Sequence, residues 1–168
     1  MSSADRSEIA CPRCGGHALF RDAFEFHVDA PAGRTAQRWG GWHVVERYPR
    51  LVPWVAPKGS SSQYLVSGGD DGQGYATGHD GVVECAACGA PFAHVLAWPD
   101  DAWWQWSIRG RMLWARDRAH ARQILEYVRA TDRPARPQSG PLGNLPSHFL
   151  SAKVRETVVK AIERRLQA

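Results

Sequence analysis

Two short stretches decide how this chain folds: Cys11-Pro12-Arg13-Cys14-Gly15-Gly16 and Cys85-Ala86-Ala87-Cys88-Gly89. They hold all four cysteines of the 168 residues, and each is a C-x-x-C pattern followed by glycine. Two residues between the cysteines allow one tight turn to place both sulfurs on one ion. Backbone N–H groups of the turn can point at the sulfurs, and the glycine can adopt the positive φ that closes it. Because Zn²⁺ prefers four thiolates in a tetrahedron, the predicted ligands of one structural zinc ion are Cys11, Cys14, Cys85 and Cys88.

These two turns resemble the knuckles of the zinc-ribbon superfamily, which carry the patterns C-P-x-C-G and C-x-x-C-G. The resemblance covers the knuckles and their flanking strands, and it implies a small antiparallel β module held by the metal. It implies no particular activity, because zinc ribbons serve many tasks. Seventy residues separate Cys14 from Cys85, far more than is usual between such pairs. Either the ribbon carries a large insertion, or the two pairs do not share an ion; pairing between two chains is a further variant.

Three other interpretations of the cysteines stay open. The first pair also fits a redox motif of the thioredoxin type, although Gly15-Gly16 is poor material for the helix that such a motif begins. Iron in a rubredoxin-like site would use the same four ligands. A structural disulfide is disfavoured because the polar, acidic N-terminus has no export signal. The uncharged stretch Cys85–Pro99 is too short to span a bilayer. We therefore expect a cytoplasmic protein with no membrane partner.

The net charge of +4 is unevenly distributed along the chain. Residues 1–108 hold 8 basic and 12 acidic side chains, whereas residues 109–168 hold 13 basic and 5 acidic ones. The chain also has eight tryptophans, and arginine outnumbers lysine by 18 to 3. A basic C-terminal third indicates an anionic partner, while the alternative is a solvated helical surface.

The chain divides into three predicted regions. Residues 1–9 are expected to be a disordered tail, and residues 10–98 a zinc-ribbon module with a long insertion and a flexible loop at about 56–81. Residues 99–168 are expected to form a tryptophan-rich strand followed by two basic helices. The predicted fold class is therefore α+β: an antiparallel zinc-ribbon module with two C-terminal helices.

Strands are predicted where β-formers alternate with polar residues or where short apolar runs end at turn residues. These are 18–28, 38–48 with a bulge or bend at Gly40-Gly41, 51–55, 63–66, 91–98 and 102–108, the last with Trp104, Trp106 and Ile108 on one face. Helices are predicted at 117–130, capped by Asp117, and from 147 or 151 to 166. Their apolar stripes are Ala121, Ile124, Leu125 and Val128, and then Val154, Val158, Ile162 and Leu166. A proline-rich linker or arm separates the helices at 131–146. The segment 113–155 resembles a helix pair found behind zinc ribbons in small bacterial proteins, which implies no activity.

The leading functional hypothesis is nucleic-acid binding. Arginine suits phosphate by its bidentate geometry, and exposed tryptophans can stack on bases. The candidate binding residues are Arg118, Arg122, Arg129, Lys153, Lys160, Arg164, Trp103 and Trp104. The second hypothesis is a protein–protein adaptor or accessory subunit. In it, the tryptophans, the loop at about 56–81 and the proline-rich arm contact a partner protein. The oligomeric state is not predicted.

No catalytic pattern is present. The chain lacks the phosphate-binding G-x-x-x-x-G-K-[ST], the hydrolase G-x-S-x-G, the zinc-protease H-E-x-x-H and the H-x-E of zinc deaminases. The acidic pairs Asp70-Asp71 and Asp100-Asp101 lie in glycine- or proline-containing turns. His17 and His94 flank the knuckles, but four cysteines already complete a closed site that leaves no open position for water. We therefore expect a protein that is not an enzyme.

Overall fold

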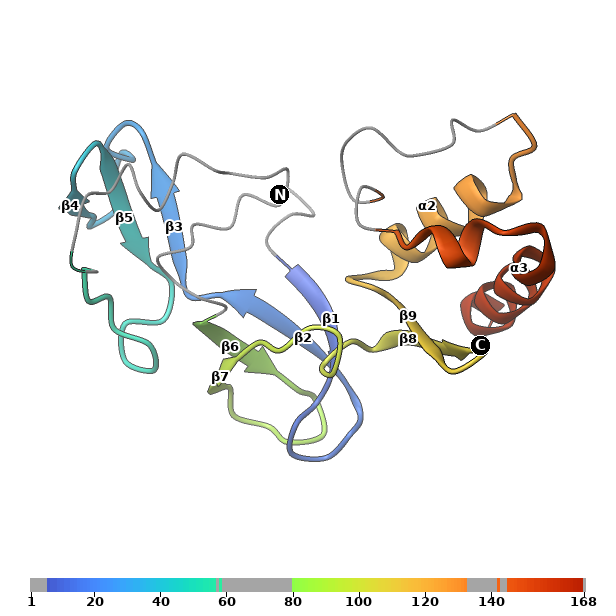
Figure 1. Cartoon of the computed structure of the whole chain (residues 1–168). Helices are drawn as coiled ribbons and strands as arrows, with labels where there is room; N and C mark the ends of the chain where they lie inside the picture. The colour runs from blue at the N-terminus through green and yellow to red at the C-terminus, as the bar shows by residue number, and fades with distance from the viewer. Residues whose placement is uncertain (1–5, 57, 59–79, 133–141, 143–144, 168) are drawn as a thin grey trace.

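Each C-x-x-C pair lies in the turn of its own β-hairpin in the computed structural model, which describes residues 6–56, 58, 80–132, 142 and 145–167. The first hairpin is β1 (Arg6–Ala10) with β2 (His17–Asp22), and the second is β6 (Asp80–Glu84) with β7 (Phe92–Val95). β2 pairs antiparallel with β6, so the sheet order is β1-β2-β6-β7 and the two turns lie at the same end (Figure 1). Apolar residues that alternate along these strands form a core beside the turns: Ile9, Ala18, Phe20, Val83 and Leu96.

The insertion between β2 and β6 builds a sheet of its own at one end of the molecule (Figure 1). Its strands are β3 (Phe24–His27), β4 (Gln37–Trp39) and β5 (Trp42–Glu46), in the order β3-β5-β4. Aromatic residues fill its separate core, which consists of Ala23, Phe24, Trp39, Val44 and Trp54. The large insertion expected from the cysteine spacing is therefore a folded subdomain over its described part.

Several predicted strands differ from the observed ones. The stretch 18–28 is two strands in two sheets, because the chain turns at the fully buried Ala23, whose N–H donates to the Asp80 carbonyl. Gly40, at a φ of 60°, makes a tight hairpin turn between β4 and β5 where we expected a bulge or bend within one strand. Residues 51–55 are not a strand, since the N–H groups of Leu51 and Val52 both donate to the Tyr48 carbonyl in a turn.

The C-terminal region packs a hairpin against two helices. The hairpin is β8 (Trp104–Ile108) with β9 (Arg111–Ala115), and the helices are α2 (Arg118–Arg129) and α3 (Ala152–Gln167), with the 3-10 turn η3 (Ser147–Leu150) before α3. The Asp117 side chain accepts from the His120 N–H at 2.7 Å, as the predicted cap requires. The predicted apolar stripes are buried, apart from Leu166, which is half-buried. Strand β9 was not predicted.

One strand edge joins the β1-β2-β6-β7 sheet, called the ribbon below for its shape, to the C-terminal region. β1 continues its pairing beyond the ribbon sheet: the Glu8 N–H donates to the Arg116 carbonyl, and the Trp103 N–H donates to the Glu8 carbonyl. The prediction of a disordered tail over 1–9 is therefore wrong for residues 6–9, which form most of β1 because Ser7 and Ile9 are buried beneath these partners. Residues 1–5 lie outside the described residues.

The mixed antiparallel sheets and two α-helices confirm the α+β fold class. Asp80 and Gly81 belong to β6, so the loop predicted at about 56–81 ends earlier than expected. The rest of that loop from residue 59, the predicted strand at 63–66 and most of the linker at 131–146 lie outside the described residues.

Candidate metal centre

The four cysteine sulfurs meet between the two hairpin turns. All four Sγ atoms lie within 4.8 Å of one another. Two of the separations cross from one turn to the other, with 3.6 Å between Cys11 and Cys88 and 3.6 Å between Cys14 and Cys85. Zinc–sulfur bonds of about 2.3 Å in a tetrahedron put sulfurs about 3.8 Å apart, so this donor set fits one tetrahedral ion. The possibility that the two pairs bind separate ions does not fit this geometry, and no disulfide joins the cysteines.

Both turns have the same hydrogen bonding, which explains the shared glycine. The Gly15 N–H donates to the Cys11 carbonyl at 2.7 Å, and the Gly89 N–H donates to the Cys85 carbonyl at 3.1 Å. Gly15 has a φ of 72° and Gly89 a φ of 79°, a conformation that L side chains rarely adopt. The glycine therefore closes each turn, as the sequence pattern predicts.

Backbone amides in the first turn are directed at the sulfurs. Burial raises the pKa of the Cys11 thiol, but the N–H groups of Arg13 and Cys14 donate to its sulfur and bring that pKa down from 9.0 to about 7. The Gly16 N–H donates to the Cys14 sulfur and lowers that pKa, but neighbouring thiols leave it raised overall. The turn thus favours a thiolate at Cys11, the form that binds metal.

The cluster as a whole resists full ionisation without a cation. Hydrogen bonds with the thiols of Cys14 and Cys11 raise the pKa of Cys88 to about 12. Four sulfurs this close cannot all carry a negative charge unless a positive ion lies among them. The arrangement is therefore chemically suited to a divalent ion that displaces the thiol protons as it binds.

The site is buried on one side and open on the other. Cys11 and Cys85 are buried against the ribbon core, whereas Cys14 is exposed and Cys88 is half-buried. The guanidinium carbon of Arg13 lies 3.7 Å from the centre of the Phe92 ring, so a side chain of the first turn also covers the start of β7. The knuckles are therefore held together by packing as well as by their sulfurs.

The two histidines near the knuckles have other partners. His17 Nε2 lies 3.2 Å from a Glu8 carboxylate oxygen, and His94 Nε2 lies 2.8 Å from a carboxylate oxygen of Asp101. Within the described residues, the group with metal-binding geometry is the set of four cysteines. The closed four-sulfur set expected from the sequence is thus the arrangement that the structure brings together.

The predicted nucleic-acid-binding residues are spread over both helices, and three cations have partners within the protein. Arg118 donates to the Leu166 carbonyl, Arg129 pairs with Glu163, and Lys160 pairs with Glu156 at 2.6 Å. The start of α2 thus contacts the end of α3 through the Arg118 side chain. Exposed side chains without an acidic partner among the described residues are Arg122, Lys153 and Arg164.

The two predicted stacking residues differ from each other. Trp104 is only 4% exposed, and its Nε1 donates to Glu8 at 2.6 Å, so the prediction that it offers a face to a base is wrong. Trp104 is buried because it lies on the same face of β8 as Trp106, and this face packs into the C-terminal core. Trp103 is half-buried and lies under the guanidinium of Arg165, 4.6 Å from its ring centre.

Sequence reasoning missed two residues around this contact. Glu8 was assigned to the disordered tail, yet its carboxylate accepts hydrogen bonds from Trp104 of β8 and from the N–H of Arg118 at the start of α2. Arg165 was not named as a binding residue. The one signal in the sequence was that Arg165 lies close to the apolar stripe of the last helix, which suggests contact with the rest of the protein.

Comparisons with protein-family models, with curated proteins and with solved structures each return no match. In the part of the chain that the structure describes, no helix combines the length and the apolar character needed to cross a membrane.

Proposed function

We propose that this chain is a non-enzymatic, zinc-stabilised protein that binds nucleic acid through its basic C-terminal region. The observation that carries the proposal is the group of exposed cations on α2 and α3 that have no acidic partner among the described residues: Arg122, Lys153 and Arg164. Cations of this kind release counterions from phosphates when they bind, which drives association at low salt. We also propose that the protein is located in the cytoplasm.

Zinc is the proposed ion because four thiolates are its usual donor set in structural sites. When bound, it would hold the two hairpins together and supply folding free energy. Iron would use the same donors, so metal analysis of the purified protein distinguishes the two. A closed set of four sulfurs leaves no position for a reacting water, which supports a structural role and a protein without catalytic activity.

The test is a binding titration against salt. Labelled single-stranded DNA, duplex DNA and RNA are titrated with wild-type protein at several salt concentrations. The variant Arg122→Gln/Lys153→Gln removes two exposed cations from the helices. The matched control Arg38→Gln/Arg50→Gln removes two exposed cations from the insertion and changes the net charge equally. We expect steeply salt-dependent binding that weakens in the helix variant and not in the control.

Equal weakening in both variants would mean that net charge alone, and not a basic face, governs association. Absence of binding at low salt would overturn the proposal.

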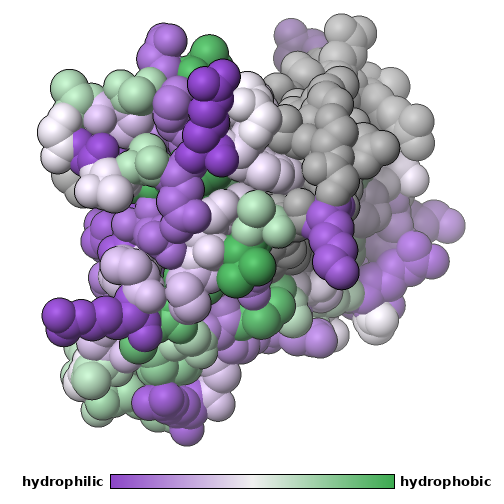
Figure 2. Space-filling model, turned by 90° about the vertical axis from the view of Figure 1, so that its left-hand side faces the viewer, coloured by the Kyte–Doolittle hydropathy of each residue, from purple (hydrophilic) through white to green (hydrophobic). Residues whose placement is uncertain are grey.

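A protein–protein adaptor is the second candidate, and a sheet edge favours it. Among the described strands, β7 pairs with β6 alone, and Val95 at its end is 63% exposed. An edge of this kind can accept an extended segment of a partner protein. Figure 2, which looks onto the insertion end, shows hydrophobic residues in small separate groups among hydrophilic ones. If no nucleic acid binds, affinity capture with wild-type protein against a Val95→Lys variant tests whether the β7 edge holds a partner.

A further inference from the structure

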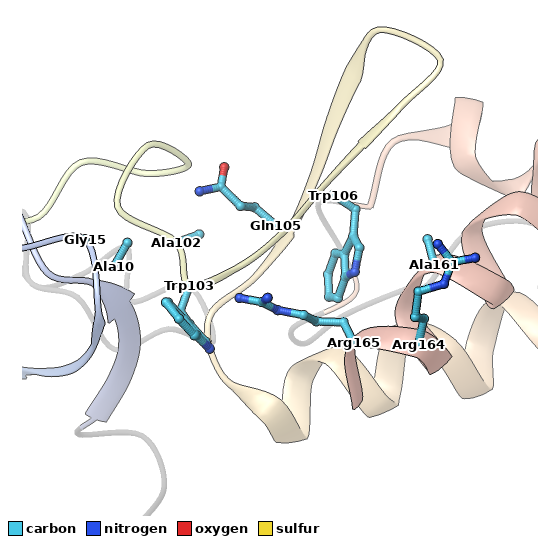
Figure 3. Close-up of a pocket in the computed structure, with 9 residues that line it drawn as sticks. All are labelled: Ala10, Gly15, Ala102, Trp103, Gln105, Trp106, Ala161, Arg164 and Arg165. Atoms are coloured by element: carbon cyan, nitrogen blue, oxygen red, sulfur yellow. The ribbon is translucent and has the colours of Figure 1, made fainter. Parts of the chain in front are cut away.

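A groove of about 590 Å³ lies where the first knuckle, the β8 hairpin and the end of α3 meet. Gly15 of the knuckle lines one side, and Arg164 and Arg165 of α3 line the other. Trp103, Gln105 and Trp106 complete the walls (Figure 3). This volume falls within the range of about 300–1,000 Å³ that is typical of small-molecule pockets.

The groove combines positive charge with aromatic surface. Among the described residues, two arginines and two tryptophans line it, and no acidic side chain does. Figure 3 shows the Arg165 side chain extended toward Trp103, where its guanidinium carbon lies 4.6 Å from the ring centre. An anion that carries a planar ring matches this lining, because arginine binds phosphate and a guanidinium plane or an indole can stack on a base.

The Trp103–Arg165 pair is held in place before any ligand arrives. The Trp103 N–H donates to the Glu8 carbonyl at 3.2 Å. The His17 ring packs edge-on against the indole, with 5.2 Å between ring centres. A platform already fixed by its neighbours loses little conformational entropy when a ring stacks on it.

A second observation concerns Trp106, whose side chain lies between β8 and α3 in Figure 3. The residue is 8% exposed, and its buried Nε1 has no hydrogen-bond partner among the described residues. A buried donor without an acceptor is unfavourable, and native proteins rarely keep one without a reason. The wall of the groove therefore includes a polar group that is not paired in this conformation.

We infer that this groove binds a nucleotide unit, with its phosphate on Arg164 and its base stacked on the Trp103–Arg165 pair. The inference rests on the proposed function and names the part of the nucleic acid that the protein recognises. A neighbouring hollow of about 340 Å³ shares Ala161 and Arg164 with the groove, but Lys160 in its lining is paired with Glu156, so the phosphate is assigned to Arg164. The shared chemistry also fits a free nucleotide, which the experiment separates from a strand.

Stacking is tested by a change that keeps the charge. Arg165→Lys retains the positive charge but removes the planar guanidinium, and Arg50→Lys, at an exposed arginine of the insertion, is the matched control. Both variants and the wild type are titrated with oligouridylate, with UMP and with ribose 5-phosphate. We expect Arg165→Lys to weaken oligouridylate binding about tenfold, within the range that stacking of one base contributes. Ribose 5-phosphate, which has no base, should bind more weakly than UMP and be indifferent to this change.

The phosphate contact is tested by salt dependence. Arg164→Gln should reduce the magnitude of the slope of log K against log salt by about 1, because one phosphate fewer is neutralised. Melting temperatures and circular dichroism of each variant verify that the fold is kept. If Arg165→Lys alters the fold, the shift in indole fluorescence that wild-type protein shows with UMP, and lacks with ribose 5-phosphate, tests the stacking directly.

The outcomes separate the inference from the proposed function. If oligonucleotides bind and lose affinity in Arg122→Gln/Lys153→Gln but not in Arg164→Gln or Arg165→Lys, the groove inference is overturned and the proposed function stands. If UMP binds in the groove and oligouridylate does not, the groove stands as a site for a free nucleotide and the proposed function fails. If wild-type protein binds none of the probes, both are overturned.

Discussion

At the scale of single residues, Glu8 connects the ribbon to the helices. Its carboxylate accepts from Trp104 Nε1 at 2.6 Å and from the Arg118 N–H at 3.3 Å, and it lies 3.2 Å from His17 Nε2. Trp104 is buried and Arg118 begins α2, so one side chain satisfies a core donor and the positive end of a helix. No short-range pattern marks such a residue, because Trp104 and Arg118 lie 96 and 110 positions away from it in the sequence.

Replacing Glu8 by alanine should therefore destabilise the whole chain. The change leaves the buried Trp104 Nε1 without an acceptor, which costs about 1–3 kcal/mol. Chemical denaturation followed by tryptophan fluorescence measures the free energy of unfolding. Glu8→Gln keeps one acceptor oxygen and should lose less than Glu8→Ala. Equal stability of all three proteins would show that the junction does not depend on this carboxylate.

A second carboxylate gives the insertion sheet a dependence on pH. Hydrogen bonds from Arg34, at 2.5 and 3.0 Å, together with those from Arg47 and His27, lower the pKa of Glu25 from 4.5 to about 2. Because the folded-state pKa is lower than the unfolded one, this stabilisation is complete above pH 4.5 and is lost as the pH falls toward 2. It amounts to at most about 3 kcal/mol.

Glu25→Gln should thus lower the melting temperature at pH 7 and flatten its decline between pH 5 and pH 2.5. Thermal denaturation across that range measures both effects. Glu126→Gln removes an exposed carboxylate from α2 and serves as the control. A variant with the same pH profile as wild type would show that the ion pairs of Glu25 add nothing to stability.

At the scale of elements, the knuckles followed directly from the sequence because every determinant is local. The cysteine spacing, the closing glycine and the amides that point at sulfur all lie within six residues. The same is true of α2, where Asp117 and a regular apolar stripe mark the start and the buried face. The ligand set was also predictable from the sequence, because the chain has four cysteines and a tetrahedral site needs four donors.

The elements that sequence reasoning missed depend on distant contacts or on turns with unusual backbone angles. β1 is short and polar, and it is ordered by residues 102–103 and 116 on its outer edge. Arg109 and Gly110 were interpreted as the end of a strand. They have φ angles of 51° and 75°, which instead make the tight turn of the β8–β9 hairpin. The groove could not be predicted, since its walls come from three regions of the chain.

The second knuckle provides a sharp test of local conformation. Gly89→Ala places a side chain at a φ of 79°, although no atom lies within 4 Å of the added methyl group. The expected cost of about 1–2 kcal/mol therefore comes from the backbone alone. Gly41→Ala, which has equal space and no positive φ, is the matched control. Competition with a chromophoric chelator should show weaker metal binding for Gly89→Ala and wild-type binding for Gly41→Ala.

At the scale of the whole molecule, three separate cores lie side by side, with the ribbon between the insertion sheet and the helices (Figure 1). The core of the C-terminal region contains no residue from the cysteine-bearing hairpins. The ion should therefore stabilise the ribbon far more than the helices, even though one strand edge joins the two.

Removing the metal should unfold the molecule in parts. Chelation, or Cys85→Ser, is expected to release one ion per chain and to expose the amides of β1, β2, β6 and β7 to hydrogen exchange. The amides of α2 and α3 should remain protected, and the helical circular dichroism should largely persist. Simultaneous loss of protection in all four strands and both helices would mean that the chain unfolds as a single cooperative unit.

The pairing of Asp22 with Gly81 in the ribbon sheet has a consequence for how this chain can change in length. The insertion leaves the sheet and returns to it at adjacent positions, so its two ends occupy the place of an ordinary hairpin turn. The closure entropy of such a segment rises by only about 0.6 kcal/mol for each doubling of its length. The connection between β2 and β6 can therefore tolerate insertion, deletion or exchange of sequence. The four cysteines keep their positions when this segment changes.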